Sequence, residues 1–176
     1  MPALPEGSRV LELGCGDGKT LAAMPGDWRI TALDISSGAL RLSRRGDAVL
    51  ILADASRLPL QEESFDAVFA FHVTGHLLRP GREALAREAA RVLRSGGSLF
   101  LREFGAEDMR AGRGDEVEQG TFRRGPGILT HYFTGREVVQ LFSGLKPVVV
   151  GTHRWNLRIR GRDLLRSEIQ AVFIKS

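Results

Sequence analysis

The chain has 176 residues, 43% hydrophobic and 26% charged, which suits one domain with one packed core and excludes a disordered chain. A single cysteine, Cys15, excludes an internal disulfide and a thiolate metal cluster. No apolar run approaches the roughly 18 residues that cross a bilayer, and the first residues lack the pattern of a signal peptide. We therefore expect residues 1–176 to form a single cytoplasmic domain without a membrane partner.

Basic residues outnumber acidic ones, 25 against 21, and the calculated pI is about 10.0. The excess gathers in residues 154–168, in the last quarter of the chain, where only Asp163 and Glu168 oppose five arginines: Arg154, Arg158, Arg160, Arg162 and Arg166. Such a surface would suit a nucleic acid, although an arginine-rich solvated surface is the simpler interpretation.

Strands and helices alternate through the first 104 residues. Apolar runs predict strands over 8–13, 28–33, 48–53, 65–71 and 98–104. Capped or amphipathic segments predict helices over 17–24, 36–44 and 81–93, the last closed by residues 95–97. Two further strands, 146–151 and 168–175, are joined by the arginine-rich segment, and their short connection makes one of them antiparallel. This order predicts an α/β fold, a three-layer α/β/α sandwich with a doubly wound, mostly parallel seven-stranded sheet.

The segment between the fifth strand and the next helix has no sustained periodicity. It is rich in glycine and charge, and a loop of this length in a compact domain is typically a lid or a disordered segment. The helix after it begins at Thr134, which forms a capping box with Glu137. We expect core motifs over 8–104, a loop or lid over 105–133, and a C-terminal helix and strands over 134–176.

A glycine-rich turn follows the first strand. In the segment VLELGCGDGKT, residues 10–20, glycines stand at every second position: Gly14, Gly16 and Gly18. Glycine lets the backbone turn sharply and approach a ligand, and the following helix offers free N–H groups to an anionic group. Nicotinamide, flavin and phosphate binders use related turns, so the turn alone identifies no cofactor.

Three carboxylates add to this turn. Glu12 stands two residues before the first glycine, Asp34 ends the second strand, and Asp54 follows the third. Parallel strands place these residues at one edge of the sheet, where open α/β sheets bind ligands. Asp34 is suitably placed to accept hydrogen bonds from both hydroxyls of a ribose.

The chain resembles the class I, Rossmann-like methyltransferases that depend on S-adenosylmethionine (SAM). The resemblance is carried by residues 10–20, 32–36, 53–68 and 91–97. Within this class, the motifs are most similar to those of the type 11 group, which includes enzymes of ubiquinone and menaquinone biosynthesis. The resemblance covers about residues 8–104. It implies a SAM-dependent methyltransferase with SAM as its cofactor.

The resemblance also implies roles for individual residues. Glu12, Gly14, Gly16 and Asp17 would hold the methionine end of SAM and Asp34 its ribose. Ile35 would pack on the adenine, while Asp54 and the backbone of Ala55 would read the adenine edge. The predicted cofactor set is completed by Cys15, Gly18 and Phe71. For Cys15, a small structural residue in a tight turn is favoured over a reactive nucleophile.

Methyl transfer is an in-line displacement that needs alignment and no enzyme nucleophile. An oxygen or nitrogen acceptor can require a base, and histidine suits this role near neutral pH. His72 and His76 follow the fourth strand, where they should border the methyl group, and His131 and Tyr132 are placed to close the acceptor pocket. A hydrogen-bonded wall residue is an equally good interpretation of either histidine near the fourth strand.

Several functions remain open at this point. A small-molecule acceptor is favoured over RNA, including tRNA, for which Arg123, Arg124 and the C-terminal arginines argue. A SAM-binding module without catalysis and a nicotinamide-dependent oxidoreductase are further alternatives, the latter disfavoured by the glycine spacing. The first strand begins by about Ser8, so we expect the pocket to be open or completed by another subunit, as in a homodimer.

Overall fold

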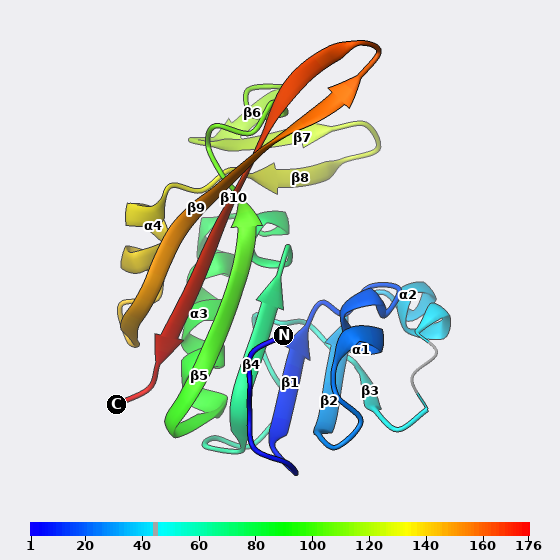
Figure 1. Cartoon of the computed structure of the whole chain (residues 1–176), viewed down its shortest axis with the longest axis vertical. Helices are drawn as coiled ribbons and strands as arrows, with labels where there is room; N and C mark the ends of the chain where they lie inside the picture. Colours follow the sequence, from blue (N-terminus) through cyan, green and yellow to red (C-terminus); the bar gives the residue numbers. More distant parts are fainter. Residues whose placement is uncertain (44–45) are drawn as a thin grey trace.

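The computed structural model describes residues 1–43 and 46–176, and its largest element is a seven-stranded sheet (Figure 1). Neighbours among β1 to β5 pair in parallel, whereas β10 pairs antiparallel with both β5 and β9. The predicted sheet with one antiparallel strand near the C-terminus is therefore confirmed. In spatial order the strands are β3 (Val49–Leu52), β2 (Arg29–Asp34), β1 (Arg9–Leu13), β4 (Phe65–Phe71), β5 (Leu93–Phe104), β10 (Arg162–Ile174) and β9 (Lys146–Ile159).

Helices cover both faces of this sheet. The described residues form α1 (Lys19–Ala23), α2 (Ser37–Leu42), the short 3-10 helix η1 (Thr74–His76), α3 (Arg79–Val92) and α4 (Gly135–Leu141). None of these helices is long and apolar enough to span a membrane. In β1, Leu11 joins the core cluster that contains Leu85 of α3, whereas Val10 joins the cluster that contains Leu21 of α1. Adjacent strand residues face opposite sides of a sheet, so this alternation confirms the three-layer sandwich.

The ends of the predicted helices agree with the structure to within a few residues, with one exception. Ser36 caps α2 by accepting a hydrogen bond from the backbone N–H of Ala39 (3.2 Å). The predicted end of this helix at residue 44 lies outside the described residues. The exception is the segment 95–97, which was predicted to close α3 after residue 93. The helix does end at Val92, but residues 95–97 belong to β5, which begins directly at Leu93. These residues pair with the C-terminus, since the N–H of Gly96 donates to the carbonyl of Lys175 (2.8 Å).

Residues 105–133, predicted as a loop or lid, instead contain a second sheet. Its antiparallel strands are β6 (Asp115–Glu118), β7 (Thr121–Arg124) and β8 (Ile128–His131). Each of these strands has four residues, which is too few for an alternation of apolar and polar residues to be recognised in the sequence. Arg82 of α3, with a side chain only 6% exposed, holds this sheet to the core through Glu118 (Nη1 to Oε1, 2.6 Å). The segment is therefore a packed part of the domain.

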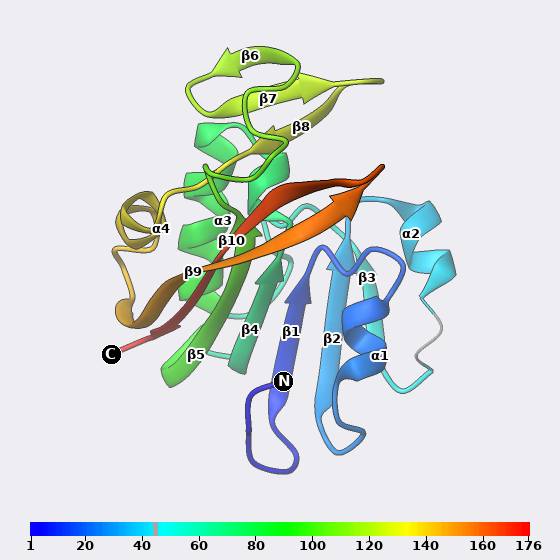
Figure 2. The same cartoon turned by 45° about the horizontal axis from the view of Figure 1, so that its top comes forward.

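The arginine-rich segment, predicted as a connection, belongs to β9 and β10. These strands form one long hairpin that turns at Arg160 and Gly161, both with positive φ (48° and 76°). The predicted strands 146–151 and 168–175 are only its base, because pairing continues to Ile159 and Arg162. Figures 1 and 2 show the hairpin reaching past the carboxyl ends of β1 and β4, beside the small sheet. Both unpredicted features thus lie at the edge where the parallel strands end.

Candidate cofactor and acceptor site

The turn between β1 and α1 requires its glycines. Gly14, Gly16 and Gly18 all have positive φ (68°, 53° and 83°). A Cβ on Gly14 would lie 2.7 Å from Cγ2 of Val73, and one on Gly18 would lie 2.7 Å from Oγ of Ser43. A Cβ on Gly16 would meet no atom within 4 Å, so this residue leaves the backbone open to a ligand. We call residues 14–18 the glycine bend.

Glu12 is buried beneath the glycine bend. It is 2% exposed, and its Oε2 has no hydrogen-bond partner among the described residues. Burial raises the pKa of Glu12 to about 7, a hydrogen bond with Thr20 acts in the opposite direction, and the charge of Asp34 adds to the rise. A positively charged ligand group at this point would satisfy the carboxylate and favour its ionised form.

Asp34 and Asp54 follow adjacent strands at the edge that carries the bend. Oδ2 of Asp34 accepts a hydrogen bond from the backbone N–H of Gly16 (2.9 Å). The N–H of Ala53 donates to the carbonyl of Asp34 (3.1 Å), so Asp54 lies at the end of the neighbouring strand. The Asp54 carboxylate accepts hydrogen bonds from the N–H and hydroxyl of Ser56 (both 2.8 Å). The glycine bend and the two strand-end carboxylates therefore share one edge.

The other residues predicted to contact the cofactor border the same edge. Ile35 is 74% exposed and offers apolar surface beside Asp34, whereas Ala55 is buried. Asp17 forms an exposed ion pair with Lys19 (3.0 Å). Cys15 is buried, and burial raises the pKa of its thiol to about 11, so the thiol stays protonated at neutral pH.

His72, directly after β4, lies beside the glycine bend, because its neighbour Val73 contacts Gly14. It has a positive φ of 56°, uncommon for a residue with a side chain. Its Nε2 lies 3.0 Å from Oε1 of Glu168, and its ring packs on Phe104 at 4.4 Å between centroids. Its Nδ1 is buried without a partner among the described residues. His72 thus stands between the cofactor site and the end of β5.

Two glutamates around His72 were not singled out in the sequence. Glu103 of β5 is 1% exposed and accepts a hydrogen bond from the N–H of Thr74 (2.7 Å). Burial raises the pKa of Glu103 to about 7, although the charge of His72 opposes this rise. Burial also favours a higher pKa for Glu168. Hydrogen bonds from His72 and Gln170 outweigh this effect and keep the pKa of Glu168 below its usual range. The signal missed was a carboxylate next to the last residue of β5 and another on β10, at the position paired with that last residue.

Phe71, His76, His131 and Tyr132 lie in different surroundings. The Arg102 guanidinium lies 4.7 Å from the ring centroid of Phe71. His76 is exposed, and its Nδ1 lies 2.7 Å from the carbonyl of Leu129. The structure does not bring it together with His72 through any described contact.

His131 and Tyr132 are wall residues of the small sheet. His131 is 2% exposed, and both its ring nitrogens are engaged, with Thr121 and with Glu137 (2.7 Å each). Glu137 therefore uses its carboxylate on His131, while its N–H donates to Thr134 in the predicted cap (3.2 Å). Tyr132 is buried, and its hydroxyl accepts a hydrogen bond from Arg124 (2.7 Å). In this geometry His131 has no free nitrogen for an acceptor proton.

Comparison with known proteins gives a consistent result. Over 160 residues the chain is 29% identical to a tRNA N(3)-cytidine methyltransferase of Gallus gallus, covering 80% of this chain and 43% of that protein. Over 111 residues it is 39% identical to a demethylmenaquinone methyltransferase of Mycobacterium sp. (strain KMS), covering 60% and 45%. The chain thus spans less than half the length of either relative.

A solved structure extends the likeness to the whole fold. The crystal structure of a SAM-dependent methyltransferase from Methanosarcina mazei superposes with a TM-score of 0.78 at 26% identity, covering 98% of this chain and 95% of that one. Residues 11–101 match the family described as the methyltransferase domain, which is more than half of the chain. The resemblance inferred from the motifs is confirmed, and with it SAM as the cofactor. The chain belongs to the methyltransferase domain family of class I SAM-dependent methyltransferases.

Proposed function

We propose that this chain transfers the methyl group of SAM to an acceptor bound where β4 and β5 end, and that the acceptor is a small molecule. The observation that carries the proposal is the buried, unpartnered Oε2 of Glu12 under the glycine bend. A buried carboxylate oxygen without a partner is costly, and the cationic methionine end of SAM would remove that cost.

The remaining cofactor residues lie at three strand ends, and each strand end would bind a different part of SAM. The N–H groups of the glycine bend would meet the carboxylate of the methionine end, and Asp34, already fixed by Gly16, would accept the ribose hydroxyls. Exposed Ile35 would cover one face of the adenine. Asp54 would accept from the adenine edge, with Ala55 beside it. Bound SAM supplies a methyl group on a positively charged sulfur, so the chain has to align the acceptor and manage its proton.

His72 is the best placed base for that proton. A carboxylate can only accept, so Nε2 of His72 donates to Glu168 and Nδ1 carries the lone pair. Nδ1 would then take the proton of an oxygen or nitrogen acceptor that displaces the side chains burying it. Glu168 and the Phe104 ring hold the imidazole in place.

The test is a methyl-transfer assay with labelled SAM against a metabolite panel, run beside calorimetric titrations with S-adenosylhomocysteine (SAH) and NADH. Saturable SAH binding, no NADH binding and label on a metabolite support the proposal. SAH binding without transfer to any acceptor would favour a binding module. NADH binding without SAH binding would favour an oxidoreductase.

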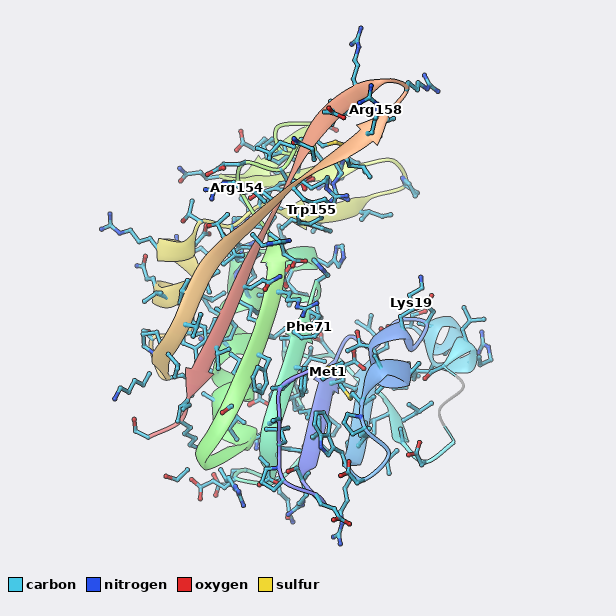
Figure 3. All side chains as sticks on the ribbon, viewed as in Figure 1. Met1, Lys19, Phe71, Arg154, Trp155 and Arg158 are labelled. Atoms are coloured by element: carbon cyan, nitrogen blue, oxygen red, sulfur yellow. The ribbon has the colours of Figure 1, made fainter. Side chains whose placement is uncertain are left out.

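RNA is a second candidate acceptor, and the hairpin favours it. Figure 3 shows Arg158 near the hairpin tip, with Arg154 and Trp155 closer to its middle. Arg154 already pairs with Glu107 (2.6 Å), whereas Arg160 is exposed at the turn. A relative named for a tRNA substrate also matches 80% of the chain. Salt-dependent retention of RNA that is lost in Arg158→Glu with Arg160→Glu would favour RNA, and no retention at low salt would exclude it.

A further inference from the structure

Phe104, the last residue of β5, is surrounded by cationic side chains. The Arg110 guanidinium lies 4.0 Å from the centroid of its ring, and the Arg166 guanidinium lies 5.5 Å from it. The His72 ring packs on the same side chain at 4.4 Å. Because His72 adjoins Val73, which contacts Gly14, this cluster is the continuation of the cofactor site toward the hairpin and the small sheet.

One buried carboxylate orients both arginines. The side chain of Asp108 is fully buried, and its Oδ1 accepts from Nε of Arg110 (2.8 Å), while its Oδ2 accepts from Nε of Arg166 (2.7 Å). Only Nε of each guanidinium is used in these ion pairs, so the terminal nitrogens remain for another acceptor. Nη2 of Arg110 is buried without a hydrogen-bond partner among the described residues. Side chains fixed in this way lose little entropy when an oxygen-rich group binds.

A third arginine is linked to this cluster through Tyr132, whose ring centroid lies 6.4 Å from that of Phe104. Arg124 of β7 donates from Nη2 to the hydroxyl of Tyr132 (2.7 Å). That hydroxyl lies within electrostatic reach of Arg124, Arg110 and Arg166, and of one opposing carboxylate, Asp108. The cluster therefore holds an excess of two positive charges in partly buried surroundings, where a charge attracts a counter-ion more strongly than in open solvent.

We propose that Arg110, Arg124 and Arg166 form a phosphate-binding subsite that anchors the methyl acceptor beside His72. A phosphate ester carries close to two negative charges and enough oxygens to accept from several guanidinium groups at once, whereas a carboxylate has two oxygens and one charge. The inference rests on the proposed function for its location and narrows the acceptor to a phosphorylated molecule. The two charges favour the phosphate monoester of a small metabolite. The phosphodiester backbone of RNA, with one charge per phosphate, is the alternative source that the test distinguishes.

The test uses the full chain saturated with SAH and titrated with inorganic phosphate, ribose 5-phosphate and ribose. We expect both phosphates to bind saturably and ribose to bind at least about tenfold more weakly than its phosphate ester. Arg110→Gln should weaken binding of both phosphates by about tenfold or more, whereas Arg87→Gln, at an exposed residue of α3, should change it less than about twofold. Arg124→Gln provides a second variant if loss of Arg110 disturbs folding around Asp108.

SAH affinity, measured in every variant, separates this proposal from the one on which it rests. Wild-type chain that fails to bind SAH contradicts the proposed function. Normal SAH binding with phosphate affinity unchanged in both Arg110→Gln and Arg124→Gln overturns the subsite. Equal weakening of phosphate binding in Arg87→Gln, or binding of ribose as tight as that of ribose 5-phosphate, also overturns it. A uridine hexanucleotide and ribose 5-phosphate are then compared as competitors of inorganic phosphate. If the hexanucleotide displaces phosphate at a much lower concentration than ribose 5-phosphate does, RNA is the source of the phosphate. The reverse order would identify a metabolite.

Discussion

Two neighbouring regions of the sheet edge are built in different ways. The cofactor edge, residues 12–18, 34–36 and 54–56, consists of short turns that directly follow β1, β2 and β3. The acceptor edge, residues 71–76, 102–110, 131–132 and 166–168, is assembled from segments up to about a hundred residues apart, such as His72 and Glu168. The first depends on local backbone geometry and the second on long-range ion pairs. Changes in one region should therefore leave the other largely intact.

The largest effect is expected at the attachment of the acceptor edge. Arg82→Ala removes the charged partner of the partly buried Glu118 carboxylate and leaves it only the Arg79 N–H and the Thr121 hydroxyl. This should cost about 3–5 kcal/mol of unfolding free energy. Hydrogen exchange should show opening of β6 to β8, while SAH affinity of the folded protein stays within about threefold of wild type. Arg79→Ala, at a side chain that is 74% exposed, is the control and should cost about 0.5 kcal/mol or less. Equal costs of the two changes would contradict the account.

The next effect concerns the glycine bend. In Gly14→Ala the new Cβ meets Val73 at a positive φ, which should cost about 2–3 kcal/mol of unfolding free energy and also weaken SAH binding. Gly26→Ala is the matched control, because a Cβ there meets no atom within 4 Å. Denaturant unfolding and SAH calorimetry measure both quantities. Tight SAH binding by Gly14→Ala would show that the bend does not position the ligand.

Asp34 tests the contribution of a side chain to the cofactor edge. Asp34→Ala removes the charged acceptor of the Gly16 N–H and the proposed partner of the ribose, so SAH should bind about 10- to 100-fold more weakly. The exposed Asp27, changed to alanine, is the control for loss of one negative charge. Phosphate binding at the acceptor edge should change little. An unchanged SAH affinity would remove Asp34 from the cofactor site.

The smallest change in unfolding free energy is expected at Glu168, and this change should depend on pH. Its folded pKa lies below the ordinary value of 4.5, so its contribution to stability is present above that value and is lost as the pH falls. Glu168→Gln should therefore cost about 1 kcal/mol near pH 7, and the difference from wild type should shrink toward zero below about pH 4. Urea unfolding at several pH values measures it. A difference that is constant with pH would show that the charge of Glu168 does not stabilise His72.

The sequence predicted the cofactor edge better than the acceptor edge. The alternating core, the glycine bend, Asp34 and the Thr134 cap follow from neighbours in the chain, and the structure places them as expected. The small sheet was missed because four-residue strands show too little periodicity, and the hairpin was cut short because its outer half is polar and exposed. The roles of Glu103 and Asp108 depend on partners 29 and 58 residues away, which no local pattern indicates.

The measurement that tests the central claim most directly is proton release on SAH binding. The pKa of Glu12 is raised by burial to about 7, and contact with the cationic methionine end should lower it, so binding should release a proton from Glu12. Calorimetry near about pH 6.5 in buffers of different ionisation enthalpy should show this release in the wild type and lose it in Glu12→Gln. Affinity of the wild type should also rise with pH up to about 7 and then level off. Identical proton release in the wild type and Glu12→Gln would contradict the account, because Glu12 would then not be the group that the bound cation satisfies.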